Sequence, residues 1–219
     1  MNNYFFELTH TQSYYKMITK RIHYISGIII SLFVSFHLVN HVFSVFGVEK
    51  HIEIMNSIRL FYRNIFVETI LLSAVVIQIV SGIKLVIQNR KKTISKFEKL
   101  GIYSGLYIAF FFIVHIGAVM IGRIVLKLDT NIYFGAAGLN IFPLNLFFIP
   151  YYSAAIMAFF SHLSSIHYKK MKNKIFGLTP NIQSIAIIVF GVFLMLYIIY
   201  GLTNHFNGMQ IPYQYNLIQ

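Results

Sequence analysis

The sequence contains no cysteine among its 219 residues. Without thiols the chain forms no disulfide, holds no iron–sulfur cluster and has no cysteine nucleophile. A bound metal would therefore have histidine, acidic or methionine side chains as its ligands. The sequence also has no Gly-rich phosphate loop and no P-loop, which excludes the common nucleotide-binding motifs.

Charged residues are scarce as well. They make up 11% of the chain, compared with roughly 25% in an ordinary soluble domain, whereas hydrophobic residues make up 57%. Five apolar stretches are each long enough for the roughly 20 residues that a helix needs to cross the hydrocarbon core. They run approximately over residues 25–46, 66–87, 102–126, 144–166 and 185–202.

The apolar stretches are continuous rather than alternating. Lipid offers no partner for backbone N–H and C=O groups, so a spanning segment is a helix or part of a closed barrel, and the continuous pattern favours a helix. The first stretch lacks a small-residue cleavage site, so we expect it to stay as a membrane helix rather than to be removed as a signal peptide. The sequence therefore predicts an all-α integral membrane protein, with a five-helix bundle that forms one transmembrane domain over residues 1–219.

Lysine and arginine gather at one end of the predicted bundle. Twelve of the 18 basic residues lie in three segments at that end, and five lie at the other end with four of the six acids. The three basic segments contain Lys16, Lys20 and Arg21; Arg90, Lys91, Lys92, Lys96 and Lys99; and Lys169, Lys170, Lys172 and Lys174. The positive-inside rule then places the N-terminus inside and the C-terminus outside. The distribution indicates contact with lipid headgroups, and we expect no nucleic acid partner.

Three of the nine histidines lie well inside the apolar stretches: His37, His115 and His162. An ionisable group inside a membrane costs on the order of a few kcal/mol unless it is satisfied, so it usually faces the bundle interior and marks a functional site. Histidine is also a common axial ligand of haem iron.

The depths of these histidines decide which of them lie together. At about 1.5 Å per residue, His37 lies about 18 Å along the first stretch and His115 about 20 Å along the third, which runs in the same direction. His162 comes late in an antiparallel helix, so it lies nearer the opposite leaflet. Two level imidazoles on facing helices are what a six-coordinate haem b requires. A hydrogen bond to a carbonyl of another helix is the alternative role, and for His162 both roles stay open.

Several short segments resemble a known family. Residues 21–27 (RIHYISG) and 35–41 (SFHLVNH) resemble the first helix of the cytochrome b membrane-anchor subunits of succinate dehydrogenase and fumarate reductase. Residues 111–115 (FFIVH) and 159–162 (FFSH) resemble the segments of two further haem ligands in that family. The single-polypeptide form of this anchor has five helices and about this length.

The resemblance implies a function. The protein would be a non-catalytic, haem b-binding electron-transfer subunit of a succinate:quinone oxidoreductase-type complex, located in a bacterial cytoplasmic or a mitochondrial membrane. Flavoprotein and iron–sulfur subunits on the inner face would be its partners, and membrane quinone would exchange electrons with it. Two alternatives stay open: a stand-alone membrane haem-binding protein with no catalytic partner, and a scaffold without haem.

The sequence departs from the family pattern in the second helix. The family has a histidine ligand shortly before a glycine, and the matching residues 76–82 (VIQIVSG) offer Gln78 instead. In the family pattern the first and third helices share one haem, while the second and fourth share another. The resemblance therefore keeps the pair of His37 and His115, breaks the pair that contains His162, and implies one haem in the outer half of the membrane.

Two further sets of residues are candidates for cofactor contacts. Arg59 and Arg63 lie one helical turn apart, in a segment that resembles small stand-alone members of the same helical superfamily, and would grip haem propionates. Their alternative role is contact with lipid headgroups from a helix that lies on the membrane surface. His23 and Ser26 lie where the respiratory family contacts quinone, although Tyr24 replaces the arginine that some members carry after the histidine. Interfacial anchoring is the alternative for this second pair.

Overall fold

The computed structural model describes residues 2–89 and 95–216. The residues Arg90, Lys91 and Lys92 of the predicted basic connection lie outside the described residues. The regular structure that is described is helical, apart from one isolated bridge between Ile175 and Leu178. The predicted all-α class is therefore confirmed for this part of the chain.

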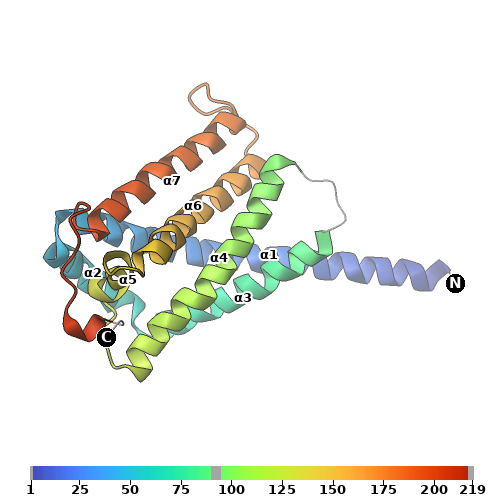
Figure 1. Cartoon of the computed structure of the whole chain (residues 1–219). Coiled ribbons are helices and arrows are strands. Elements are labelled where there is room, and N and C mark those ends of the chain that lie inside the picture. Colours follow the sequence, from blue (N-terminus) through green and yellow to red (C-terminus); the bar gives the residue numbers. More distant parts are fainter. Residues whose placement is uncertain (1, 90–94, 217–219) are drawn as a thin grey trace. The chain divides into compact units, whose positions relative to one another are not determined.

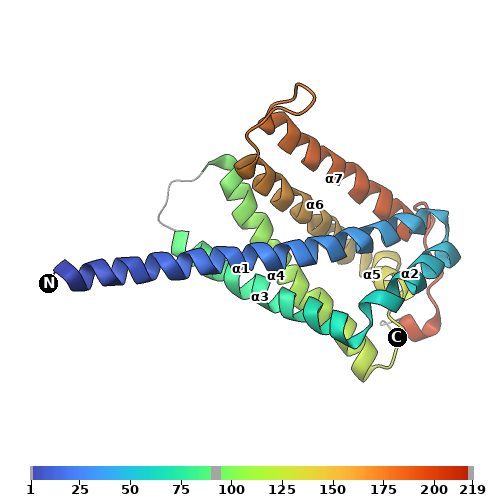
Figure 2. The same ribbon diagram turned by 180° about the vertical axis from the view of Figure 1, so that it is seen from behind.

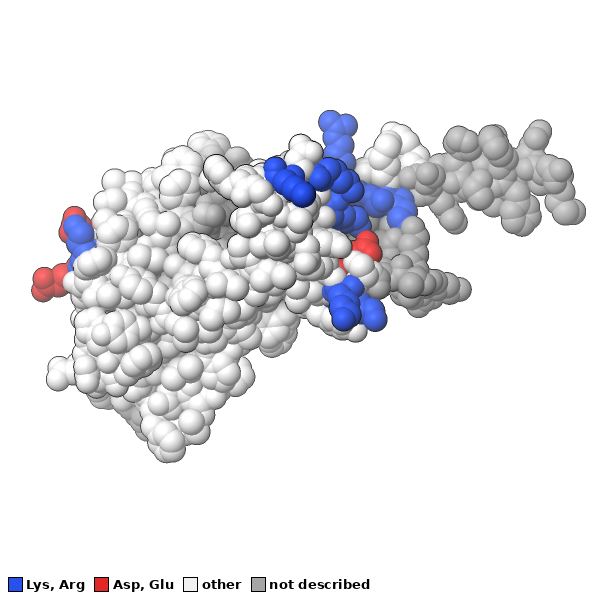
Figure 3. All heavy atoms as spheres, turned by 90° about the horizontal axis from the view of Figure 1, so that it is seen from above, with Lys and Arg blue, Asp and Glu red and all other residues white. Residues whose placement is uncertain are grey.

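Within residues 2–89 and 95–216, five helices are long and apolar enough to cross a membrane, as the sequence predicts. They are α1 (Asn2–Val42), α3 (Ile65–Asn89), α4 (Lys96–Met120), α6 (Asn145–Lys170) and α7 (Pro180–Leu202). Most of the surface drawn in Figure 3 is uncharged, as the surface of a helix bundle in lipid should be. Several helices start earlier than the apolar stretches, because backbone hydrogen bonding continues through the polar flanks.

Local sequence signals explain where two of these helices begin. Ser95 and Glu98 form a capping box at α4: the Ser95 hydroxyl accepts from the Glu98 N–H at 3.2 Å, and the Glu98 carboxylate accepts from the Ser95 N–H at 3.1 Å. The N-cap of α7 is Thr179, and Pro180 takes the first helical position, where its missing N–H leaves no helical hydrogen bond unmade.

Shorter helices fill the connections. They are α2 (Val48–Tyr62), α5 (Ile132–Asn140), the 3-10 turns η1 (Phe43–Phe46) and η3 (Tyr213–Tyr215), and the π-helical segment η2 (Ile121–Val125). The arginine segment is helical in part: α2 contains Arg59 and ends before Arg63. Its position on the membrane surface stays a prediction.

The chain divides into two compact units. Unit 1 consists of Met1–Ser35 and Tyr62–Thr93, and unit 2 consists of Phe36–Phe61 and Ile94–Gln219. Within unit 2, α6 packs along both α4 and α7, and the two ribbon views show it between them (Figures 1 and 2). The turn η1 packs against α7, and α5 packs against α6. Unit 2 therefore holds three of the five long helices together with the end of α1.

The contact between α6 and α7 is close. The Ser164 hydroxyl donates a hydrogen bond to the Ser184 carbonyl at 2.7 Å, and both serines are fully buried. Further along, Gly191 leaves room for Phe160, because a Cβ atom at Gly191 would lie 2.6 Å from the Phe160 Cβ. Small and polar residues of this kind let membrane helices approach one another.

The orientation of these spans is the subject of a first prediction. A reporter fused after Gln219 should be outside, and one inserted near Lys96 should be inside, because the positive-inside rule assigns the basic connections between α3 and α4 and between α6 and α7 to the inner side. Cysteine labelling measures the same topology, because the described chain has no cysteine of its own. A single cysteine introduced at each of the two positions should be labelled from one side of the membrane only. Labelling of both positions from the same side would contradict the five-span topology.

Candidate functional site

A cluster of histidines lies in unit 2. The structure brings His37 of α1 and His115 of α4 together, with their ring centroids 6.3 Å apart and their planes at 63°. These are the two histidines that depth along the sequence predicts to be level. The site therefore has one imidazole from each of two membrane helices.

Sequence reasoning missed a third member of this cluster. His41 lies one helical turn after His37, and its Nε2 is 3.1 Å from the Nε2 of His37. The signal in the sequence was their i, i+4 spacing, which places both side chains on one face of α1. Two ring nitrogens at this distance share one proton, so one ring donates and the other accepts.

The helix α2 contributes a fourth histidine. His51 is only 2% exposed, and its Nε2 lies 3.4 Å from the Nδ1 of His41 and 3.2 Å from the side-chain nitrogen of Asn40. One assignment satisfies all these contacts with neutral rings: Asn40 and His41 donate to His51, and His37 donates to His41. The His51 Nδ1 and the Asn40 side-chain oxygen are then buried without a partner.

The charge state of His51 follows from its surroundings. Burial, the neighbouring His37 and the positive charge of Arg59 lower the pKa of His51 from 6.5 to about 4. His51 is therefore neutral at physiological pH, and it can accept the two hydrogen bonds that the neutral assignment gives it.

Aromatic rings surround His115. Phe111, one turn earlier on α4, stacks on its ring at 4.9 Å with an angle of 12° between the planes. Tyr152 of α6 meets it edge to face at 6.0 Å, and Phe148 stacks on Tyr152 at 5.8 Å. This side of the site is thus aromatic, and it restricts the orientation of the His115 ring.

The distances allow a test of the predicted haem. Two imidazoles that bind one iron from opposite faces hold their ring centroids about 6 Å apart, because an iron–nitrogen bond is about 2 Å long and the ligating nitrogen lies about 1 Å from its ring centroid. The 6.3 Å between His37 and His115 fits this requirement. The contact of His41 with the His37 Nε2 has to open for that nitrogen to bind iron. No group of three or more histidine and acidic residues in the described part of the chain fits a bare metal ion.

The predicted propionate contacts are only partly in this unit. The guanidinium of Arg59 forms an ion pair with Asp129 at 2.8 Å and donates to the Thr130 carbonyl at 2.8 Å. Two of its nitrogens are thereby bound to the segment that follows η2. Arg63 belongs to unit 1. Contact of both arginines with haem propionates therefore stays a prediction.

His162 has a different partner. Its Nδ1 lies 2.9 Å from the Gly101 carbonyl of α4, to which it donates. Gly105 leaves room for the ring, because a Cβ atom there would lie 3.1 Å from the His162 Cε1. In the structure, then, His162 makes the interhelical hydrogen bond that was one of its two predicted roles.

The predicted quinone residues form a network within unit 1. Ser26 donates to the Gln78 side-chain oxygen at 2.6 Å, and the Gln78 side-chain nitrogen donates to the His23 Nε2 at 3.2 Å. The other ring nitrogen, His23 Nδ1, then donates to the Ser81 hydroxyl at 2.9 Å. This network joins α1 to α3. Contact of His23 and Ser26 with quinone stays a prediction, and it would compete with these hydrogen bonds.

Comparisons with known proteins do not assign the chain to a family. No protein family, curated protein or solved structure matches the chain. The five candidate membrane spans in the described part of the chain indicate an integral membrane protein.

Proposed function

We propose that the protein binds one haem b inside the membrane, with His37 and His115 as the axial ligands, and transfers electrons. The observation that carries the proposal is the 6.3 Å separation of these two rings, which come from different membrane helices of one unit. The reduced-minus-oxidised spectrum of the purified protein and of its histidine variants tests it.

Haem bound here supplies one-electron redox chemistry. His37 and His115 would both hold the haem iron, which would leave no open position for oxygen or a substrate and would favour electron transfer. Phe111 and Tyr152 pack against the His115 ring and restrict its orientation. The chain's own residues thus bind and orient the cofactor, and they perform no bond-breaking chemistry.

Electron transfer requires partners, because the chain has no cysteine for an iron–sulfur cluster and no nucleotide-binding motif. We propose flavoprotein and iron–sulfur subunits at the basic inner end and quinone in the membrane, as in a succinate dehydrogenase or fumarate reductase complex. One observation favours the alternative of a stand-alone haem protein. His23 and Ser26, the predicted quinone residues, both hydrogen-bond to Gln78 of α3, and a bound quinone would compete with these hydrogen bonds.

Purification from native membranes distinguishes these two functions. If the protein is an anchor subunit, flavin and iron–sulfur proteins should co-purify with it in mild detergent, at about one copy each. If it acts alone, haem should co-purify without them. A cross-linker added before solubilisation controls for partners that detergent removes.

The number of haems is a separate prediction. Haem-to-protein stoichiometry should approach one, because a carboxamide is a poor ligand for haem iron and Gln78 is already hydrogen-bonded to Ser26 and His23. Absorbance of the extracted haem, set against amino-acid analysis of the same sample, measures the ratio. A ratio of two would mean that another residue takes the place of the missing ligand.

A further inference from the structure

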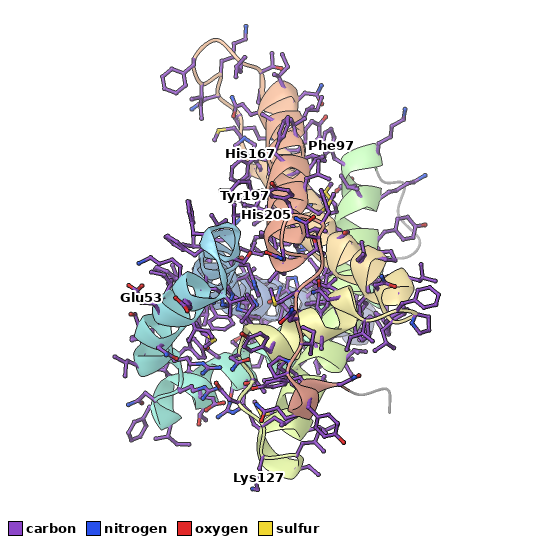
Figure 4. All side chains as sticks on the ribbon, turned by 60° about the vertical axis from the view of Figure 1, so that its left-hand side comes forward. Glu53, Phe97, Lys127, His167, Tyr197 and His205 are labelled. Carbon is purple, nitrogen blue, oxygen red and sulfur yellow. The ribbon has the colours of Figure 1, made fainter. Side chains whose placement is uncertain are left out.

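A groove between α6 and α7 is separate from the histidine cluster. Its volume is about 560 Å³, and it lies at the end of the two helices where the α6–α7 loop joins them. Leu163 and Ile187 belong to its apolar wall, and His167 and Lys170 line it in the last turns of α6. Figure 4 shows His167 beside α7. The groove therefore has a polar mouth and an apolar interior.

The depth of the groove agrees on both helices. Phe160 lies ten residues before Lys170 on α6, and Phe190 lies ten residues after Pro180 on α7, so both lie about 15 Å from the helix ends. Their rings meet edge to face, with centroids 5.5 Å apart and planes at 77°. This pair closes the deep end of the groove. A depth of about 15 Å is half of the roughly 30 Å hydrocarbon core, and thus the length of one acyl chain in one leaflet.

The walls of the groove are fixed. The buried hydrogen bond from Ser164 to the Ser184 carbonyl sets the spacing of the two helices. The mouth is fixed as well, because the His167 Nε2 donates to the Gln183 side-chain oxygen at 2.8 Å. Gln183 in turn donates to the Leu178 carbonyl at 2.7 Å, which ties the loop to α7.

Neighbouring lysines serve different sides of α6. Lys169 turns toward α4, where it pairs with Glu98 at 3.1 Å, and Tyr168 stacks on Phe97 at 4.2 Å on the same side. Lys170 lines the groove toward α7 instead. The described residues that line the groove include no acid, and Lys170 brings a positive charge to its mouth.

We propose that this groove is a binding site for an acidic phospholipid. The phosphate lies at Lys170, and one acyl chain runs along Leu163 and Ile187. Basic pockets between membrane helices bind anionic headgroups in this way. A quinone has a neutral head, for which a positive mouth offers no advantage, so the charge favours the phospholipid. This site does not depend on haem binding.

Native mass spectrometry of the delipidated full chain tests the proposal. Phosphatidylglycerol and phosphatidylcholine with the same acyl chains are added in equal amounts, and the lipid that stays bound is counted. We expect preferential retention of phosphatidylglycerol, and a loss of about fivefold in Lys170→Gln. Lys172→Gln and Lys174→Gln remove the same charge from the adjoining loop but do not line the groove, so they should change retention by less than about twofold.

A second variant tests binding of the acyl chain in the apolar interior, independently of charge. Leu163→Trp fills the groove and should reduce phosphatidylglycerol retention with every lysine intact, and circular dichroism checks that the helices are formed. Equal retention of the two lipids would overturn the proposal. Equal losses in all three lysine variants would also overturn it, because they would mean general attraction to a positive surface. Displacement of phosphatidylglycerol by an equimolar added quinone would overturn it as well.

Discussion

Replacing either His37 or His115 with alanine should abolish the low-spin b-type spectrum of the purified protein. A haem held by both imidazoles would be six-coordinate and low-spin, and without one of them it would change spin state or leave the protein. The double variant should do no more damage than either single one, because the two residues act on one iron. The measurement is the reduced-minus-oxidised difference spectrum after expression with added haem.

Two other histidines provide matched controls in the same unit. His162→Ala should leave the spectrum largely intact, because His162 hydrogen-bonds to the Gly101 carbonyl. His41→Ala should also keep both axial ligands, although it removes the side chain that contacts the His37 Nε2. Loss of the spectrum in His41→Ala together with its retention in His37→Ala would mean that the ligand is His41, one helical turn later. Folded wild-type protein without any such spectrum would contradict the haem proposal and leave the scaffold alternative.

The helices that are long and apolar enough to cross a membrane are the part of the fold that the sequence predicts best. A run of about 20 apolar residues is a strong signal because lipid permits few other structures. The connecting helices give no such signal: α5 has only nine residues, and α2 mixes polar and apolar residues. Their formation depends on packing against the long helices, which a local pattern does not contain.

The candidate site shows the same division. Rise per residue along two parallel-running helices is enough to predict that His37 and His115 are level. The role of His51 depends on the chain reversing after η1 so that α2 returns to α1, and no local pattern in the sequence predicts that tertiary contact. Gln78 could be recognised as a missing ligand from sequence, whereas its hydrogen bonds to Ser26 and His23 required the structure.

The ion pair of Arg59 and Asp129 is expected to stabilise unit 2 by an amount that is easily measured. Arg59 is 9% exposed, and it joins α2 to the segment after η2 through Asp129 and the Thr130 carbonyl. Arg59→Gln leaves that carbonyl without its donor, and Asp129→Asn leaves a buried positive charge without its counter-charge. Because the Asp129 side chain is half exposed, we expect each change to destabilise by about 2 kcal/mol. Thermal unfolding in detergent should shift down by about 5 °C.

A surface ion pair on the same helix is the control. Lys50 and Glu53 also lie 2.8 Å apart, but their side chains are 42% and 64% exposed, so Lys50→Gln should change the unfolding temperature by less than about 1 °C. The double variant of Arg59 and Asp129 should lose less than the sum of the two single losses, since both remove one shared interaction. The haem midpoint potential separates the two roles of Arg59: a structural contact leaves it unchanged, whereas a contact with a propionate shifts it in Arg59→Gln. An unfolding temperature for Arg59→Gln equal to that of Lys50→Gln would contradict the stabilising role.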